Sequence, residues 1–511
     1  MSRTHKIFSL FSLFICFIIQ GCRNSTNNNY AMSVYDLKNL IVLEEYLLGV
    51  LDRFRQELQY KVITIENYLE MTKKRNNSLE INKFAFNFEE SVPIVRRLYF
   101  DYSRLVAFLD NNSWDVCIKA IYDQEPKLPT KKDLIETTNG LYIMQSVYSM
   151  KISKMAKGIF QGVDYNSSLN AFECFTMAMF LEELDELIYA KQWLEVSLDF
   201  YMKDTVNRDL YAELGFSSIM IYELYASVLH RLGNGRDNLT VNDTLRSLNP
   251  EGFGIEKDQI QEPDMILEKE NWEAYTTFCS TENRPSKSNL YCFYKRNTSH
   301  FLYLAPLKLE ILSLNPYMVF YHDVISDNDI FLIKVEGQKN LTRARTFNLK
   351  SNNREEDSGR TTKVGWLDNN SLAIVQKMNK LVEDMTNLDL SSSAVYEVLN
   401  YGIGGFYGAH VDYYYDDFQK NDEFLDDRKA TIVFYLSDVT QGGATAFPAL
   451  NISVFPKKRS ALMWYNLDNK GNGIPNSIHT ACSTAVGSKW VMIKWLTQAA
   501  QMFRKPCLKE V

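Results

Sequence analysis

Apolar residues recur at three- and four-residue intervals through most of the first 250 positions of the chain, a spacing that predicts helices. The first such segment runs from about Ser33 to Asn77. Its near-heptad stripe consists of Leu37, Leu40, Leu47, Leu51, Phe54, Leu58, Ile65 and Tyr68. Glu44 and Lys61 interrupt this stripe. The pattern suits a coiled-coil seam between two chains, or equally an amphipathic helix that packs within its own domain.

Further helices are expected in the residues that follow. We expect them over 91–110 and 134–157, with turn-forming residues and two prolines between them, and then over 171–201 and 209–232. The last of these closes at a Gly-Asn-Gly turn. Paired amphipathic helices of this length are typical of tetratricopeptide-like (TPR-like) units, whose concave face binds extended peptides. The sequence therefore predicts an all-α N-terminal half.

The period of the pattern changes after residues 251–300, a charged and proline-containing stretch that we interpret as a linker. Short β-rich runs then predict strands over 318–322, 395–401, 430–436, 453–455, 461–465 and 490–496. Helices are expected after an N-cap at Ser326 and over 371–385. Many short strands with few flanking helices favour a double-stranded β-helix, or jelly roll, whose open mouth can hold a metal. The charged segment 416–428 is expected to form a loop over that mouth.

Length and charge set broad limits on the protein. A chain of 511 residues is too long for one compact domain, and its formal net charge of −7 gives no reason to expect a nucleic-acid partner. Residues 1–22 join a basic start to an apolar run and a small-residue end, which is typical of a secretory signal peptide, with a membrane anchor as the alternative. No other apolar run is long enough for a transmembrane helix, so we expect no membrane span in the mature chain.

Glycosylation sequons and cysteines agree with a secretory route. The sequons include Asn76, Asn111, Asn166, Asn238, Asn242, Asn297, Asn340, Asn369 and Asn451. Without the signal peptide, the cysteines that remain are Cys117, Cys174, Cys279, Cys292, Cys482 and Cys507. Their spacing does not determine how they pair, and none of it is of the tight zinc-binding type.

Candidate metal ligands lie near the C-terminus. Side chains at positions i and i+2 leave the same face of a strand, so His410 and Asp412 can reach one ion, and His479 is the candidate third ligand. Two histidines and one carboxylate are the ligand set of non-haem Fe(II) oxygenases. The glycines at 402, 404, 405 and 408 let the backbone bend or approach closely before His410.

Lys489 follows His479 by ten residues, with Gly487 between them. A hairpin turn at Gly487 would bring His479 and Lys489 onto neighbouring strands. A fixed ammonium group at the bottom of an iron pocket suits a dicarboxylate co-substrate that chelates the metal at its other end. The alternative is a lysine on an exposed strand.

At these residues the sequence resembles the α-subunit of collagen prolyl 4-hydroxylase, an Fe(II)/2-oxoglutarate dioxygenase. The matching segments are NYGIGG at 400–405, HVD at 410–412, AT at 430–431, FYLSDV at 434–439, GGATAFP at 442–448, WYNL at 464–467, His479 and GSKWV at 487–491. Their order and spacing follow the family through the last part of the chain. Earlier parts are similar to it more loosely.

The resemblance implies a catalytic set of His410, Asp412, His479 and Lys489. The first three would bind iron, and Lys489 would hold the distal carboxylate of 2-oxoglutarate. Tyr435 and Thr431, four residues apart on one strand face, would line the same pocket, and Tyr401 would sit at its mouth. L-Ascorbate is implied as the reductant that restores the iron.

The resemblance also implies how the domains and partners are organised. It assigns 1–22 to a signal peptide, 23–160 to a helical dimerisation domain, 161–250 to a TPR-like peptide-substrate-binding domain, 251–300 to a linker and 301–511 to the catalytic jelly roll. Protein disulfide isomerase as β-subunit and a second α-subunit would complete an α2β2 assembly in the endoplasmic reticulum lumen. Implied disulfides join Cys279 to Cys292 and Cys482 to Cys507.

One part of the sequence departs from this family. Where paired tyrosines are expected in the helical peptide groove the chain has Leu187 and Ile188, and two later tyrosine positions are Ser227 and His230. Tyrosine rings pack well against a polyproline II ligand, so their loss bears on specificity. We expect a procollagen-proline 4-dioxygenase acting on proline-rich polypeptide, with two alternatives: a prolyl hydroxylase of another secreted protein, or a non-catalytic assembly subunit.

Overall fold

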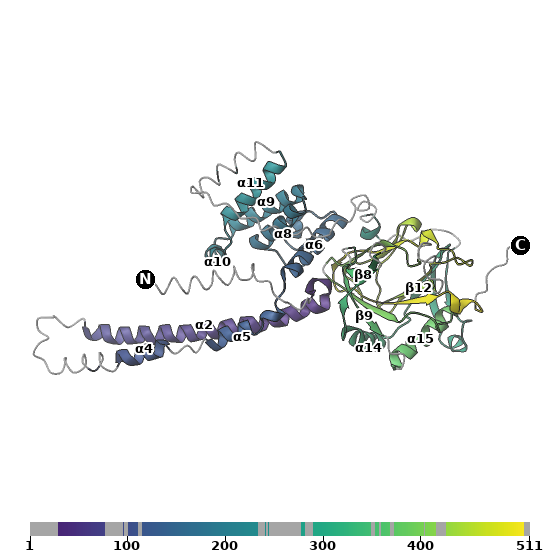
Figure 1. Cartoon of the computed structure of the whole chain (residues 1–511), viewed down its shortest axis with the longest axis horizontal. Coiled ribbons are helices and arrows are strands. Elements are labelled where there is room, and N and C mark those ends of the chain that lie inside the picture. Colours follow the sequence, from purple (N-terminus) through teal and green to yellow (C-terminus); the bar gives the residue numbers. More distant parts are fainter. Residues whose placement is uncertain are drawn as a thin grey trace, which may run out of the picture. The chain divides into compact units, whose positions relative to one another are not determined.

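A computed structural model describes residues 29–76, 96, 101–110, 115–233, 241, 244, 277–281, 290–348, 353–356, 359–367, 372–402, 404–414 and 426–504 (Figure 1). Two compact units divide these residues: one lies within 37–130, and the other combines 29–36 with the residues from 131 onward. The expected signal peptide, Cys507 and most of the expected linker and charged loop lie outside the described residues. Among the described helices, none is both long enough and apolar enough to cross a membrane.

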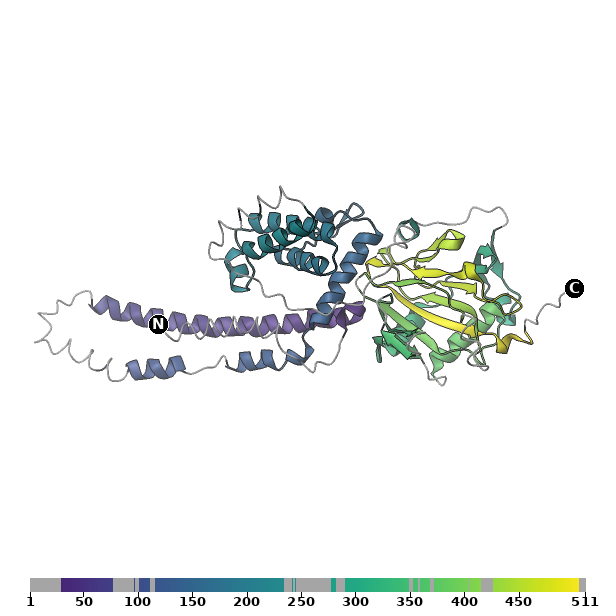
Figure 2. The same cartoon turned by 45° about the horizontal axis from the view of Figure 1, so that its top comes forward.

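The unit within 37–130 is helical. α2 (Val34–Asn76) forms over almost the whole range expected from the apolar stripe, and α4 (Tyr102–Asp110) and α5 (Asp115–Tyr122) run alongside it in Figures 1 and 2. Lys61 of α2 is buried, and its Nζ donates to the carbonyl of Leu109 at 3.1 Å. A residue that the sequence marks as an interruption of the stripe therefore helps to dock α4.

The apolar stripe of α2 serves two faces of the helix. Phe54 is only partly exposed, whereas Leu51 and Leu58 are exposed. An exposed apolar row consists of Ile41, Leu48, Leu51, Leu58, Val62 and Leu69. Its spacing of three, four and seven residues keeps these side chains on one side of the helix, next to the side that packs within the chain.

The second unit begins with short antiparallel helices. They are α6 (Lys131–Val147), α7 (Ile152–Met155), α8 (Ala171–Glu183), α9 (Leu187–Lys203), α10 (Arg208–Glu213) and α11 (Ser218–Arg231). The segment expected to be helical over 171–201 is interrupted where Asp185 adopts a φ of 60°, and 209–232 is interrupted at Gly215 with a φ of 75°. Trp193 is fully buried at their centre, where its Nε1 donates to Gln145 Oε1 at 3.0 Å.

Two antiparallel sheets make up the C-terminal part. In order across the larger sheet, the strands are β3 (Cys292–Lys295), β4 (Leu307–Leu314), β5 (Tyr317–His322), β16 (Ala461–Tyr465), β12 (Arg428–Tyr435), β19 (Trp490–Thr497), β10 (Tyr396–Tyr401), β9 (Thr362–Leu367) and β6 (Thr342–Arg343). The smaller sheet orders β11 (Tyr407–His410), β17 (His479–Ala481), β14 (Thr445–Phe447) and β15 (Ile452–Val454). Short pairs add β1 (Ile159–Phe160) to β2 (Val163–Asp164), β7 (Arg345–Asn348) to β8 (Asn353–Glu356), and β13 (Gln441–Gly442) to β18 (Thr484–Val486).

Side chains of β12 point alternately to the two faces of the large sheet and so contribute to two hydrophobic cores. Ile432 and Phe434 point to the outer face of the large sheet, where α14 (Asp327–Gln338) and α15 (Ala373–Thr386) cover it. Val433 and Tyr435 point inward and pack with Phe447 of the small sheet. The expectation of a helical N-terminal half followed by a mostly antiparallel β domain with flanking helices is thus confirmed.

The prediction of a hairpin turn at Gly487 is wrong. Gly487 does turn the chain, with a φ of 108°, but β18 before it pairs with β13, and β19 after it lies between β12 and β10 in the large sheet. His479 lies in the small sheet. His479 and Lys489 therefore approach the site from opposite sheets, because the chain crosses the sandwich at this turn instead of folding back on itself.

The expected pairing of Cys279 with Cys292 is also wrong, because Cys279 forms a disulfide with Cys482. The cause lies in the packing before Cys279: Ser453 of the small sheet donates to the carbonyl of Phe278 at 2.6 Å, which brings this segment next to Cys482. Cys292 lies on β3 at the edge of the large sheet and is a free, exposed thiol. This bond also replaces the expected pairing of Cys482 with Cys507.

Residues 29–36 pack beside the glycine-rich segment that precedes His410. A β-carbon on Gly402 would lie 1.8 Å from the carbonyl oxygen of Ala31. One on Gly404, whose φ is +61°, would lie 2.1 Å from the carbonyl oxygen of Gly140. Only glycine allows this approach. These glycines therefore dock the N-terminal segment and α6 onto the β domain.

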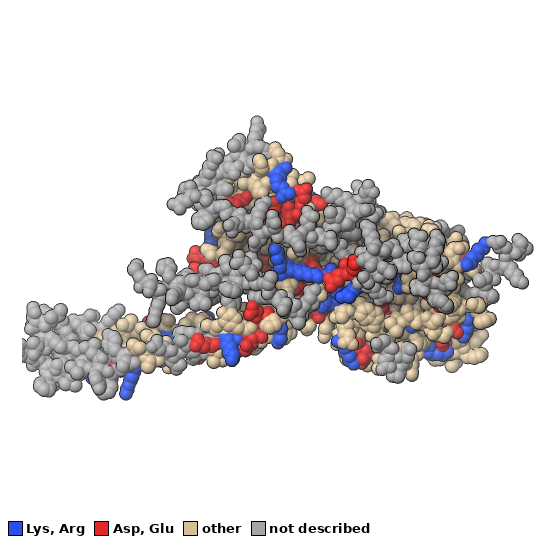
Figure 3. All heavy atoms as spheres, in the orientation of Figure 1, with Lys and Arg blue, Asp and Glu red and all other residues tan. Residues whose placement is uncertain are grey.

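The described charged side chains on the visible face are of both signs (Figure 3). On the face shown in Figure 3, Lys and Arg residues are interspersed with Asp and Glu residues. This agrees with the small formal net charge of −7 for the whole chain.

Candidate metal centre

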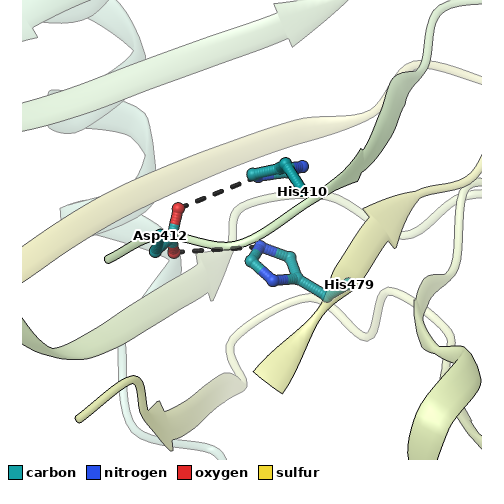
Figure 4. A group of neighbouring side chains, drawn as sticks. All are labelled: His410, Asp412 and His479. Carbon is teal, nitrogen blue, oxygen red and sulfur yellow. Dashed lines mark ion pairs between the residues drawn. The ribbon is translucent and has the colours of Figure 1, made fainter. Parts of the chain in front are cut away.

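Three side chains from two strand ends converge on one point (Figure 4). His410 ends β11 and His479 begins β17, and the two residues are direct cross-strand partners. Asp412 follows two residues after His410; one of its oxygens lies 3.7 Å from His410 Nε2 and the other 3.8 Å from His479 Nε2. Within the described part of the chain this is the only group of three such residues, with ligand atoms within 4.8 Å of one another. The spacing suits a single ion between them.

Hydrogen bonds fix the orientation of both imidazole rings. His410 Nδ1 lies 2.7 Å from the carbonyl oxygen of Gly408, and His479 Nδ1 lies 3.0 Å from that of Ser477. When each Nδ1–H donates to its carbonyl, each Nε2 presents a lone pair towards Asp412. Metal-ligating histidines are held by outer hydrogen bonds of this kind.

Protonation states in the site also suit a metal. Burial, together with His479, lowers the pKa of His410 to about 3, so its ring is neutral at physiological pH. Burial by itself would raise the pKa of Asp412, but the adjacent His479 and His410 lower it to about 2. Neutral imidazole and ionised carboxylate are the forms that bind a divalent cation.

A hydrogen-bonded pair behind the triad holds the carboxylate. Thr431 of β12 donates to Asp412 Oδ2 at 2.6 Å, and Asn466 Nδ2 donates to Thr431 Oγ1 at 2.8 Å. Tyr435, on the same strand face, shares a 2.8 Å hydrogen bond with Thr445 Oγ1. Thr431 and Tyr435 thus both face the interior of the sandwich, and Thr431 directly orients a metal-ligand candidate.

Lys489 lies deep in the sandwich with only 1% of its surface exposed. No described residue accepts a hydrogen bond from its Nζ, and burial lowers its pKa to about 7. The nearest aromatic ring is that of Tyr401, whose centroid is 4.7 Å from Nζ. The expectation that Tyr401 sits at the pocket mouth is wrong, because Tyr401 is 3% exposed and lies against the ammonium group. A buried ammonium without a partner among the described residues fits an anionic group of a bound ligand.

Asn400 connects Lys489 to the start of α2. Its Nδ2 donates to the carbonyl of Lys489 at 3.1 Å, and its Oδ1 accepts from the backbone N–H of Tyr35 at 2.9 Å. Tyr401 N–H also donates to the Lys489 carbonyl at 3.1 Å. The end of β10 therefore fixes the backbone from which Lys489 extends, and Tyr35 in turn holds the side chain of Asn400.

Two arginines near the triad were not predicted from the sequence. The ring of Tyr407 stacks on His410 with centroids 3.7 Å apart, and the Arg360 guanidinium lies 4.9 Å from the centre of the Tyr407 ring. Arg428 donates to the carbonyl of Asp412 at 3.3 Å and lies 3.9 Å from the centre of the Trp495 ring. Arg428 could have been noticed as a cation at the start of a predicted strand. Nothing in the position of Arg360 along the sequence predicts that it lies near His410.

Comparison with known families gives two matches. Residues 33–162 match the model of the prolyl 4-hydroxylase alpha-subunit, N-terminal region, and residues 396–497 match that of the 2OG-Fe(II) oxygenase superfamily. The second range contains the three converging side chains and Lys489. The first range begins in the segment that packs beside Gly402.

Similar proteins are found along nearly the whole chain. Prolyl 4-hydroxylase subunit alpha-1 of Caenorhabditis elegans is 28% identical over 509 residues, covering 93% of this chain and 90% of its own length. The human protein of that name is 27% identical, covering 93% and 95% respectively. Among solved structures, a viral collagen prolyl hydroxylase from Paramecium Bursaria Chlorella virus-1 aligns with 35% of this chain and 95% of its own, at 19% identity and a TM-score of 0.29.

The two matched ranges lie in the N-terminal and C-terminal parts of the chain, and the second carries a complete set of candidate iron ligands. The chain is similar to prolyl 4-hydroxylase α-subunits along nearly its whole length, and it is an Fe(II)/2-oxoglutarate-dependent dioxygenase.

Proposed function

We propose that this chain is the catalytic α-subunit of a procollagen-proline 4-dioxygenase. It hydroxylates peptidyl proline at C4 with O2 and 2-oxoglutarate, and releases succinate and CO2. The observation that carries the proposal is the geometry of the site: His410, Asp412 and His479 present three ligand atoms to one point, and an unpaired buried ammonium group lies in the same sandwich.

The residues present fit Fe(II) and 2-oxoglutarate. His410, Asp412 and His479 would hold the metal on one face, which leaves positions for a chelating 2-oxo acid and for O2. Iron with its co-substrate supplies the oxidising chemistry when both are bound. Thr431 and Asn466 keep the Asp412 carboxylate in place, and Phe447 and Trp464 pack around the His479 ring at centroid distances of 5.5 and 4.7 Å. These aromatic rings keep bulk water away from the ligand.

Lys489 would bind the distal carboxylate of 2-oxoglutarate and so orient its 2-oxo acid end towards the metal. The contact would also stabilise the charged form of a lysine that burial disfavours. Tyr401 and Tyr435 would line this end of the pocket. L-Ascorbate would restore Fe(II) after turnovers that consume 2-oxoglutarate without hydroxylating a peptide.

The pH dependence of 2-oxoglutarate binding is a test of this role. In the free protein the pKa of Lys489 is about 7, so the ammonium form dominates below that pH and is lost above it. Because the carboxylate binds the ammonium form, we expect the dissociation constant, measured without O2, to rise above pH 7 by roughly tenfold per unit. A Lys489→Met variant should bind weakly without this dependence. A flat profile in the native protein would contradict a carboxylate contact at Lys489.

A groove in the helical part is the proposed peptide-binding surface. A cavity of about 420 Å³ is lined by Ile188, Lys191, Gln192, Glu195 and Leu232, between α9 and the end of α11. Ile188 is 64% exposed, and the hydroxyl of Tyr225 donates to Glu195 at 3.0 Å. We propose that this TPR-like surface holds the proline-rich substrate. Its mixed polar lining favours sequences that place polar residues among the prolines, which keeps a non-collagen secreted substrate as the second candidate.

The partners follow the same proposal. The exposed apolar row on α2 would pack against the same row of a second α-subunit, as a coiled-coil or helical dimerisation contact. Protein disulfide isomerase would act as β-subunit of an α2β2 assembly. We place the protein in the endoplasmic reticulum lumen after removal of the signal peptide, and Asn166, Asn297, Asn340 and Asn451 are exposed positions for glycans.

A substrate panel separates the candidate functions. The chain, co-expressed with protein disulfide isomerase, is supplied with Fe(II), 2-oxoglutarate and ascorbate, and succinate and 4-hydroxyproline are measured on collagen-like and on charged proline-rich peptides. We expect 4-hydroxyproline in stoichiometric amounts with succinate. Product only on non-collagen peptides would favour the second candidate. Assembly with the isomerase but no succinate on any peptide would favour a non-catalytic subunit.

A further inference from the structure

A second unpaired polar atom lies beside Lys489. Thr484 is 3% exposed, and among the described residues no group forms a hydrogen bond with its Oγ1. A buried hydroxyl normally has a partner, because the loss of hydration is otherwise uncompensated. Because the described residues supply no partner, the Thr484 hydroxyl is open to a hydrogen bond with a bound ligand.

Gly443 relates the two groups in space. A β-carbon on this residue would lie 3.4 Å from Thr484 Oγ1 and 3.4 Å from Lys489 Cδ. The hydroxyl and the lysine side chain therefore flank the same glycine, and Gly443 has a φ of +72°, a conformation that other residues adopt only with strain. Because Gly443 has no side chain, space remains between the Thr484 hydroxyl and the Lys489 side chain.

The backbone around Thr484 is fixed. Its N–H donates to the carbonyl of Gly405 at 3.1 Å, and Gly443 N–H donates to the carbonyl of Ser483 at 2.9 Å. Tyr148 also donates to the Ser483 carbonyl, at 2.5 Å. Three neighbouring residues thus hold the backbone that carries the Thr484 side chain.

We propose that Thr484 Oγ1 donates a hydrogen bond to the distal carboxylate of 2-oxoglutarate, beside the ammonium group of Lys489. The inference rests on the proposed function and deepens it. A carboxylate has two oxygens with lone pairs, so one can accept from the ammonium and the other from the hydroxyl. The Lys489 ammonium group attracts any anion, whatever its shape. Thr484 adds a directional contact, which a 2-oxo acid of the wrong length does not reach.

Valine has nearly the shape of threonine without the hydroxyl, so Thr484→Val removes only the proposed donor. The measurement is equilibrium binding to the metal-loaded, isomerase-assembled protein without O2, for 2-oxoglutarate and for 2-oxobutyrate, which lacks the distal carboxylate. We expect Thr484→Val to weaken 2-oxoglutarate binding by about tenfold, the typical effect of a hydrogen bond to a charged group. Thr484→Ser should retain the native affinity for 2-oxoglutarate. The native protein and Thr484→Val should bind 2-oxobutyrate equally well.

Lys489→Met in the same assay separates this inference from the function on which it rests. Native 2-oxoglutarate affinity in Thr484→Val, with weak binding in Lys489→Met, would overturn the role of Thr484 and leave the proposed function intact. Equal losses for both ligands in Thr484→Val would assign Thr484 a structural role and also overturn the inference. Unchanged binding in both variants would contradict the carboxylate pocket as a whole.

Discussion

Replacing His479 with alanine is expected to abolish hydroxylation and to weaken metal binding by well over 100-fold. Loss of an outer partner of a metal ligand typically costs about 10- to 100-fold, and His479 is one of only three candidate ligands. The imidazole also lies against Trp464 and Phe447, so its removal opens a space that water can fill. Metal content after dialysis and anaerobic Fe(II) titration measure the effect directly, and succinate release measures turnover.

His322→Ala is the matched control for this experiment. His322 lies on β5 of the large sheet and pairs with Glu310 at 3.1 Å, with no contact to the triad. This variant should keep its metal and its turnover, and both variants should retain the helical content of the native chain. Normal iron binding by His479→Ala would show that the three side chains do not form the metal site.

Lys489→Ala should raise the dissociation constant for 2-oxoglutarate by about 100-fold or more, while iron binding stays close to native. Removing one partner of a buried charge pair costs about 3 kcal/mol or more, since the carboxylate left behind has lost both solvent and counter-ion. The smaller side chain adds no unpaired group of its own. Because burial penalises the ammonium in the free protein, this variant should also be no less stable than the native chain at neutral pH.

A second buried lysine, which lies on β19, provides the comparison. Lys494 is 4% exposed, and its Nζ donates to the carbonyl of Ala394 at 2.6 Å, so its charge already has a partner. Lys494→Ala should lower the free energy of unfolding and leave 2-oxoglutarate affinity unchanged. If the two variants lost affinity equally, the effect of Lys489 would be one of general packing and not of carboxylate recognition.

Local features of the site were predictable from sequence. The spacing of His410 and Asp412, and the position of Thr431 and Tyr435 on one strand face, depend only on the two-residue repeat of a strand. The exposed row on α2 follows in the same way from helical periodicity, although the pattern does not say which residues face the chain's own helices. Phe54 and Leu58 differ in exposure because α4 and α5 cover only one side of α2.

Features that depend on strand pairing were not predictable. The turn at Gly487 is visible in the sequence, but nothing local reveals that the chain there crosses from one sheet to the other. The partner of Cys279 depends in the same way on where its segment packs, and not on its nearness to Cys292 in the sequence. Thr484 gains its proximity to Lys489 from that crossing.

The contact between Tyr35 and the Asn400 side chain has a consequence for how the enzyme can be divided. The oxygenase half is not a continuous stretch of sequence, because residues 29–36, which lead into the long helix α2 and form its first turn, complete it. A fragment that lacks residues 29–36 would leave Gly402 uncovered and the side-chain oxygen of Asn400 without its hydrogen bond from Tyr35, next to the backbone of Lys489. To fold and function by itself, the catalytic part therefore requires a separate peptide that replaces those eight residues, as in fragment complementation.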